Sequence, residues 1–136
     1  MDAHTTQAIR KKYSAALMSN HKWRKFFTVM AEKFPGFRGI EYRFTDTASV
    51  YVGSAPSSTQ IWQSAVDDPV EEVGGPIEYK HIESITIPRV FKSRAYENAP
   101  YTEVEQPVGE FLEELRKVGS FPISKQENTV VVRGYE

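Results

Sequence analysis

The sequence contains no cysteine among its 136 residues, which excludes a disulfide framework and a zinc site built from thiolates. No apolar run reaches the roughly 20 residues needed to cross a bilayer. The first residues, M-D-A-H-T-T-Q-A-I-R-K-K, lack the apolar segment of a secretory signal. Internal repeats and low-complexity tracts are also missing. We therefore expect a cytoplasmic protein without membrane contact.

Motifs of catalysis and ligand binding are equally scarce. No G-x-S-x-G turn frames a serine, so Ser84 and the nearby His81 have no recognised nucleophile geometry. The other histidines, His4 and His21, also lack the i,i+2 or i,i+4 pairing typical of metal ligands. Gly74-Gly75-Pro76 is not followed by the lysine and helix of a phosphate-binding loop. The sequence thus predicts no catalytic residue, no cofactor and no metal.

The length and composition favour one packed domain. Hydrophobic residues make up 40% of the chain and aromatic residues 12%, which is enough for a core and unlike a disordered chain. A chain of this size buries roughly two thirds of its unfolded surface on folding. We predict a single α+β domain over residues 1–136.

Three segments have the apolar periodicity of helices. The strongest is Ser19–Pro35, in which aromatic and methionine side chains recur at steps of three and four. Ser19 or Asn20 is its predicted N-cap. A preceding helix is predicted over Thr6–Met18 and a late helix over Pro107–Val118. The side chains predicted to face inward are Ile9, Tyr13, Ala16, Leu17, Trp23, Phe26, Phe27, Met30, Phe34, Val108, Phe111, Leu112, Leu115 and Val118.

Other apolar residues alternate as in strands. Gly39–Thr45 alternates strictly, and Ser49–Val52 is predicted to be the returning strand. In Ile77–Ile87 the alternation changes phase, which predicts a bend or bulge near Lys80–Glu83. Two apolar runs around a Glu127-Asn128 turn predict a hairpin at the end of the chain. The predicted fold class is α+β, with two N-terminal helices, a mainly antiparallel sheet, and one late helix followed by a C-terminal hairpin.

The net charge of −1 results from an uneven distribution. Met1–Arg43 contains nine Lys and Arg against three Asp and Glu, whereas Phe44–Pro88 contains one lysine against seven acids. The rest of the chain is nearly balanced, with seven basic and eight acidic residues. Separated charge steers partners toward one side of a molecule, unless folding brings the segments together and cancels it. Both outcomes are open from the sequence.

Two candidate contact surfaces follow from this charge pattern. The first combines acidic residues with aromatic ones and suits a basic protein; it comprises Trp62, Asp67, Asp68, Glu71, Glu72 and Tyr79. The second is a basic face that suits nucleic-acid phosphates; it comprises Arg10, Lys11, Lys12, Lys22, Arg24 and Lys25. Trp23, by contrast, is predicted to be a buried anchor of its helix.

The order of several short motifs resembles a family of small bacterial proteins of unknown function. These motifs are Asn20-His21-Lys22-Trp23-Arg24, the run Y-K-H-I-E-S-I-T-I over Tyr79–Ile87, and the final Gly134-Tyr135. That family opens with an N-x-x-K-W-R helix, continues to a Y-K-x-I-E-W-I-x-I segment, and ends with a helix and a hairpin. The resemblance covers most of Ser19–Tyr135, with Ser84 where a tryptophan is expected. It implies no catalytic residue, because the family has no established active site.

Small bacterial proteins of this build often resemble immunity proteins of toxin–immunity systems, by analogy of size and style. The sequence therefore favours a non-catalytic protein-binding module of immunity or accessory type, with another protein as its partner. The alternative is a nucleic-acid-binding protein that uses the basic N-terminal helices, although no recognised nucleic-acid motif is present. A hydrolase with an unrecognised site is the third hypothesis.

Overall fold

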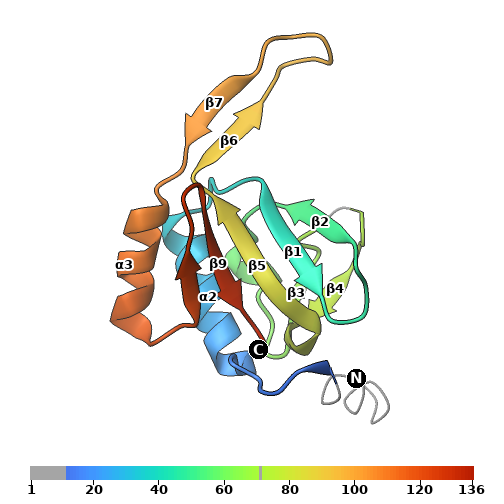
Figure 1. Ribbon diagram of the computed structural model, residues 1–136, viewed down its shortest axis with the longest axis vertical. Helices are drawn as coiled ribbons and strands as arrows, with labels where there is room; N and C mark the ends of the chain where they lie inside the picture. The colour runs from blue at the N-terminus through green and yellow to red at the C-terminus, as the bar shows by residue number, and fades with distance from the viewer. Residues whose placement is uncertain (1–11, 71) are drawn as a thin grey trace.

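A five-stranded antiparallel sheet forms the centre of the computed structural model, which describes residues 12–70 and 72–136 (Figure 1). Helices α2 (Asn20–Lys33) and α3 (Val108–Val118) cover one face of this sheet. Its strands are, in spatial order, β2 (Val50–Gly53), β1 (Ile40–Phe44), β5 (Ile82–Pro88), β9 (Thr129–Arg133) and β8 (Ile123–Lys125). Two further antiparallel pairs are β3 (Ala65–Asp67) with β4 (Pro76–Glu78), and β6 (Val90–Ser93) with β7 (Thr102–Glu105). The chain also forms two short 3-10 helices, η1 (Ser58–Gln60) and η2 (Tyr79–His81).

Helix α2 begins and ends close to the predicted positions. Ser19 is the N-cap, and its side-chain oxygen accepts a hydrogen bond from the Lys22 N–H at 3.1 Å. This bond satisfies one of the amides that have no partner within the first helical turn. The helix ends at Lys33, two residues before Pro35. The predicted helix and cap are therefore confirmed.

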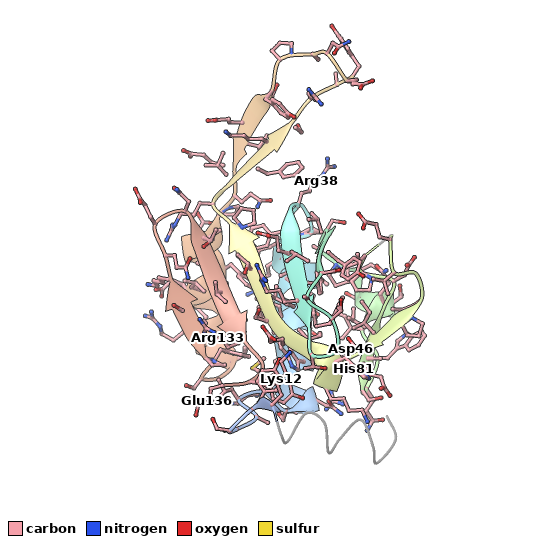
Figure 2. The ribbon with its side chains drawn as sticks, turned by 45° about the vertical axis from the view of Figure 1, so that its right-hand side comes forward. Lys12, Arg38, Asp46, His81, Arg133 and Glu136 are labelled. Atoms are coloured by element: carbon pink, nitrogen blue, oxygen red, sulfur yellow. The ribbon has the colours of Figure 1, made fainter. Side chains whose placement is uncertain are left out.

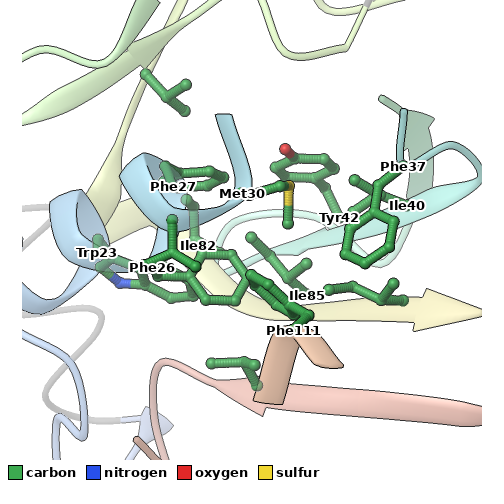
Figure 3. Close-up of a cluster of buried hydrophobic side chains, with 14 of the residues drawn as sticks. Trp23, Phe26, Phe27, Met30, Phe37, Ile40, Tyr42, Ile82, Ile85 and Phe111 are labelled. Carbon is green, nitrogen blue, oxygen red and sulfur yellow. The ribbon is translucent and has the colours of Figure 1, made fainter. Parts of the chain in front are cut away.

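The core lies between the two helices and the sheet (Figure 3). Phe26 of α2 and Phe111 of α3 meet edge to face, with 5.5 Å between ring centroids. Trp23 is buried as predicted, at 2% exposure. Burial of each large apolar side chain contributes about 1.5–3 kcal/mol. This core fixes the orientation of α2, so that its basic side chains point away from the sheet.

Strand β1 shows the predicted alternation, because Ile40, Tyr42 and Phe44 are buried and the intervening residues are more exposed. Its pairing with β5 changes register between Arg43 and Phe44. Arg43 lies opposite Ser84 and Phe44 lies opposite Ile82, which leaves Glu83 as an extra residue. The irregularity predicted near Lys80–Glu83 is thus confirmed, and η2 forms the bend before it.

The helix predicted over Thr6–Met18 is wrong in its second part. Residues 6–11 lie outside the described residues, and residues 13–18 form no helix. The Leu17 N–H instead donates to the Gly134 carbonyl at 2.8 Å. The segment runs beside the C-terminal residues because these long-range bonds use the backbone groups that a helix would pair internally. The described part of the chain therefore has one N-terminal helix in place of the expected two.

The late helix and the C-terminal hairpin are confirmed, with Gly119 following α3 and β8 pairing with β9. Two side chains that were predicted to face inward are exposed. Val118, at 38% exposure, occupies the last turn of α3 at the margin of the helix pair. Ala16 lies in the segment that forms no helix, where it makes an isolated bridge with Tyr135.

Strands β6 and β7 form an arm that projects from the body (Figure 1). The sequence predicts part of Arg89–Pro100 to be extended, and β6 confirms this. Strand β7 reads T-E-V-E, which has no apolar alternation of the kind that marks a half-buried strand, and it was not predicted. Among the described residues, no helix has the length and the hydropathy of a membrane-spanning segment.

Candidate functional site

A cavity of about 630 Å³ opens at the end of the sheet where β1 ends and β5 begins. Asp46 and Thr47 line it from the β1–β2 turn, and Glu78 and His81 line it from β4 and η2. Figure 2 shows Asp46 and His81 at this same end of the molecule. We call this site the acidic cavity; its remaining lining is mainly apolar, from Phe44, Tyr51, Val73, Pro76 and Ile77.

The ionisable groups of the acidic cavity are the carboxylates of Asp46 and Glu78 and the imidazole of His81. His81 Nε2 lies 3.2 Å from Glu78 Oε2, so these two groups form an ion pair when the histidine is protonated. Asp46 is exposed at the rim. The Glu78 side chain is 39% exposed, so water screens both carboxylates. The cavity also lies within the segment that carries the acidic excess.

The lining of the cavity offers little for nucleophilic catalysis. It contains a histidine and two carboxylates, but no serine. The hydroxyl of Thr47 accepts a hydrogen bond from the Ser49 N–H at 3.1 Å, which ties it into its own turn. Within residues 12–70 and 72–136, no three His, Asp or Glu side chains are close enough to hold a metal ion.

Several acidic residues of the predicted contact surface lie on the segment between β3 and β4, residues 68–75, which we call the acidic loop. Val73 of this loop lines the wall of the cavity. Asp68 and Glu72 are exposed, whereas Asp67 is half-buried. The loop is closed by a hydrogen bond from the Asp68 N–H to the Gly75 carbonyl at 2.9 Å. Glu71 lies outside the described residues. Folding thus brings Val73 of this loop, although neither Asp68 nor Glu72, into the lining of the cavity.

The two aromatic members of the predicted surface have different environments. Trp62 is 45% exposed, as a contact residue requires. Tyr79 is fully buried, so its predicted role in a contact surface is wrong. Its hydroxyl donates to the Trp62 carbonyl at 2.7 Å, and burial raises the pKa of Tyr79 to about 12, against the opposing effect of Arg24. The alternation of Ile77 with Tyr79 was a signal that both side chains face the core.

The predicted basic face is only partly assembled. Arg10 and Lys11 lie outside the described residues. Lys12 lies outside α2 and does not share a face with the basic residues of that helix. Its Nζ donates to the Thr45 carbonyl at 3.3 Å and lies 4.0 Å from Glu83 Oε2. This pair also brings a residue of the basic segment beside one of the acidic segment, so folding cancels part of the charge separation.

The basic residues of α2 border a second surface hollow, which we call the basic groove, of about 670 Å³ between α2, η1 and α3. Arg24 donates to the Gln63 carbonyl at 2.9 Å, and Lys25 donates to the Val118 carbonyl at 2.9 Å. Lys33, also in this groove, forms an ion pair with Glu114 at 2.6 Å. These cations hold neighbouring elements together, and each would have to exchange such a bond for a phosphate contact. Lys22, half-buried, does not line the groove.

Asp46, Glu78 and His81 were not among the predicted contact residues. Asp46 is 35 positions from His81 in the sequence, and only the pairing of β1 with β5 brings their elements together. No periodicity within either segment indicates this approach. The position of Asp46 just after a strongly alternating strand was the one available signal, since strand ends meet where antiparallel neighbours begin.

Comparison of the chain with family models, with curated proteins and with solved structures finds no match. The family resemblance described from the sequence motifs stays a prediction.

Proposed function

We propose that this chain is a non-catalytic protein-binding module, of immunity or accessory type, that binds a basic partner protein. The observation that carries the proposal is the acidic cavity, whose lining combines the Asp46 and Glu78 carboxylates with mainly apolar side chains and includes Val73 of the acidic loop. A Lys or Arg side chain matches this chemistry, because its alkyl stem packs on apolar walls while its charge meets carboxylates. We place this activity in the cytoplasm, as the sequence suggests.

Complementary charge also supports the proposal. A surface of one sign accelerates the encounter with a partner of the opposite sign and disfavours wrong partners. Exposed acids at the cavity rim and on the adjacent loop, Asp46, Asp68 and Glu72, extend this field beyond the cavity. Exposed Trp62, which lies on the chain just before β3, adds an aromatic side chain of the kind enriched at binding hot spots.

The experiment is affinity capture from the native host with a charge-reversal variant and a matched control. Asp46→Lys combined with Glu72→Lys reverses two charges at the cavity and loop. Glu110→Lys combined with Glu127→Lys reverses two exposed charges on α3 and on the β8–β9 turn. Melting curves of both variants verify that each is folded.

We expect a protein that is retained by the wild type and by the control but lost by the Asp46/Glu72 variant. Equal retention by both variants would contradict the proposal. Recovery of nucleic acid alone, with steep salt dependence, would favour the basic groove and the alternative function.

A further inference from the structure

The β6–β7 arm is a two-stranded ribbon whose strands pair only with each other among the described residues (Figures 1 and 2). It stands at the end of the sheet opposite the acidic cavity, since Arg38 lies at its root while Asp46 and His81 lie at the other end (Figure 2). Four large hydrophobic side chains on it are exposed: Val90 at 37%, Tyr96 at 69%, Tyr101 at 59% and Val104 at 50%. An isolated ribbon of this kind is at best marginally stable in water.

The root of the arm is held firmly to the body. The Gln106 side chain donates to the carbonyls of Pro88 at 2.9 Å and Arg38 at 3.0 Å, and its oxygen accepts from the Arg38 N–H at 2.7 Å. Phe91 packs so closely on Gly39 that a Cβ there would lie 2.8 Å from its ring. The fold therefore presents the ribbon in a fixed direction.

The side chains on one face of the arm already satisfy each other. Lys92 lies 3.8 Å from Glu103 across the ribbon, and the Arg94 guanidinium lies 4.7 Å from the centroid of the Tyr101 ring. Lys92 of β6 and Arg94, which follows it, are therefore engaged within the arm. Glu105, opposite Val90, has no such basic neighbour across the register.

The hydrogen bond at the end of β7 shows which of its backbone groups point toward β6 and which point outward. The Gln106 N–H donates inward, to the Arg89 carbonyl at 2.7 Å. Because inward and outward groups alternate along an antiparallel strand, the N–H and C=O of Thr102 and Val104 point to β6, and those of Glu103 and Glu105 point to the open edge. All four residues of β7 are exposed. This edge can accept another strand.

The charges on β7 decide which strand fits. A second copy joined by two-fold pairing of its own β7 would set glutamates opposite glutamates, whichever of Glu103 and Glu105 lies at the axis. Like charges directly opposite each other destabilise a sheet. A strand with Lys or Arg at those positions, and an apolar residue opposite Val104, meets the charge and the exposed apolar surface together.

We propose that the outer edge of β7 binds an extended segment of a partner protein in which Lys or Arg alternates with apolar residues. The added strand pairs with the open edge of the arm, with backbone bonds to Glu103 and Glu105 and a charge pair with the Glu105 carboxylate, which has no basic residue opposite it in the arm. This surface extends the proposed protein-binding function to the opposite end of the molecule, and its test does not involve the acidic cavity.

The probe is a synthetic peptide of alternating lysine and valine, with a second peptide that has glutamate in place of each lysine. Binding is followed by amide NMR and by hydrogen exchange. We expect the lysine peptide to protect the amides of Glu103 and Glu105 and the glutamate peptide to leave them unprotected. Higher salt should weaken the protection.

Two variants separate backbone pairing from charge. Glu103→Pro removes an outward N–H, which an edge strand tolerates, and should weaken binding about fivefold beyond Glu103→Gln, which keeps that N–H. The amide signals of Phe91 and Val104 verify that the arm remains paired in both variants.

Equal binding by Glu103→Pro and Glu103→Gln would overturn the proposal. So would lysine-peptide shifts confined to the acidic cavity, an absence of protection at β7, or protection of Glu103 and Glu105 by self-association without peptide. Of these outcomes, only shifts confined to the acidic cavity bear on the proposed function, which they would support; the charge-reversal experiment at Asp46 and Glu72 tests that function separately.

Discussion

A substitution at Gly134 tests the packing of the C-terminal segment against residues 14–17 and β5. Its N–H donates to the Glu83 carbonyl at 2.7 Å, and its carbonyl accepts from the Leu17 N–H at 2.8 Å. A Cβ at this position would lie 2.4 Å from the Ile82 carbonyl oxygen and 3.3 Å from Trp23 Cζ2. The close neighbour is backbone, so Gly134→Ala requires the C-terminal segment to move away by several tenths of an ångström.

The expected loss in the free energy of unfolding depends on the contacts that this movement disturbs. Weakening two backbone hydrogen bonds costs about 1 kcal/mol each, and crowding in a packed region costs about 1–3 kcal/mol. We expect Gly134→Ala to lower the free energy of unfolding by about 2–4 kcal/mol in total, since the two costs overlap when the segment shifts. For a chain of this size the melting temperature should fall by about 6–12 °C.

Gly109→Ala is the matched control. Gly109 lies inside α3, and a Cβ there meets nothing within 4 Å. The substitution should raise stability by about 0.5–1 kcal/mol, because alanine loses less backbone entropy than glycine in a helix. Calorimetric melting and urea titration measure both variants. A Gly134→Ala protein that melts within about 2 °C of the wild type would refute the packing described for this junction.

Three further outcomes are expected. Gln106→Ala should speed amide exchange in β6 and β7 while leaving α2 unchanged, because the Gln106 side chain joins the arm to the body; unchanged exchange in the arm would contradict this role. Burial raises the pKa of Tyr79 to about 12, so the unfolded chain releases the Tyr79 proton at a lower pH than the folded chain. The free energy of unfolding should therefore fall between about pH 10 and pH 12. Tyr79→Phe should make this fall shallower in alkaline urea titrations. Hydrogen bonds from Lys33 and Lys117 lower the pKa of Glu114, so the wild type should lose stability as the pH falls below about 4.3. In acid melting curves, the Glu114→Gln variant should lose less stability than the wild type.

The elements that could be predicted from the sequence are those whose own residues determine them. Helices α2 and α3 have apolar periodicity together with end signals such as Ser19 and Gly119. Strand β1 alternates strictly, and the phase change before Ile85 indicated the irregularity beside Glu83. In each case the local pattern and the tertiary environment favour the same structure.

The elements that could not be predicted depend on distant partners. Residues 13–18 have helical periodicity, but their backbone bonds to the C-terminal segment take the place of helical ones. Strand β7 is polar throughout and pairs only with β6. The acidic cavity combines Asp46 with His81 through strand pairing that no local pattern encodes. The acidic residues before Tyr79 favour a surface position for it, whereas its alternation with Ile77 favours the buried position that it occupies.

The most direct test of the central proposal is an amide NMR map of this protein with and without the partner recovered by affinity capture. The account predicts that the largest shifts cluster at Asp46, Thr47, Glu72 and Val73, around the acidic cavity and its loop. Shifts confined instead to Arg24, Lys25 and Thr28, along the basic groove, would contradict it.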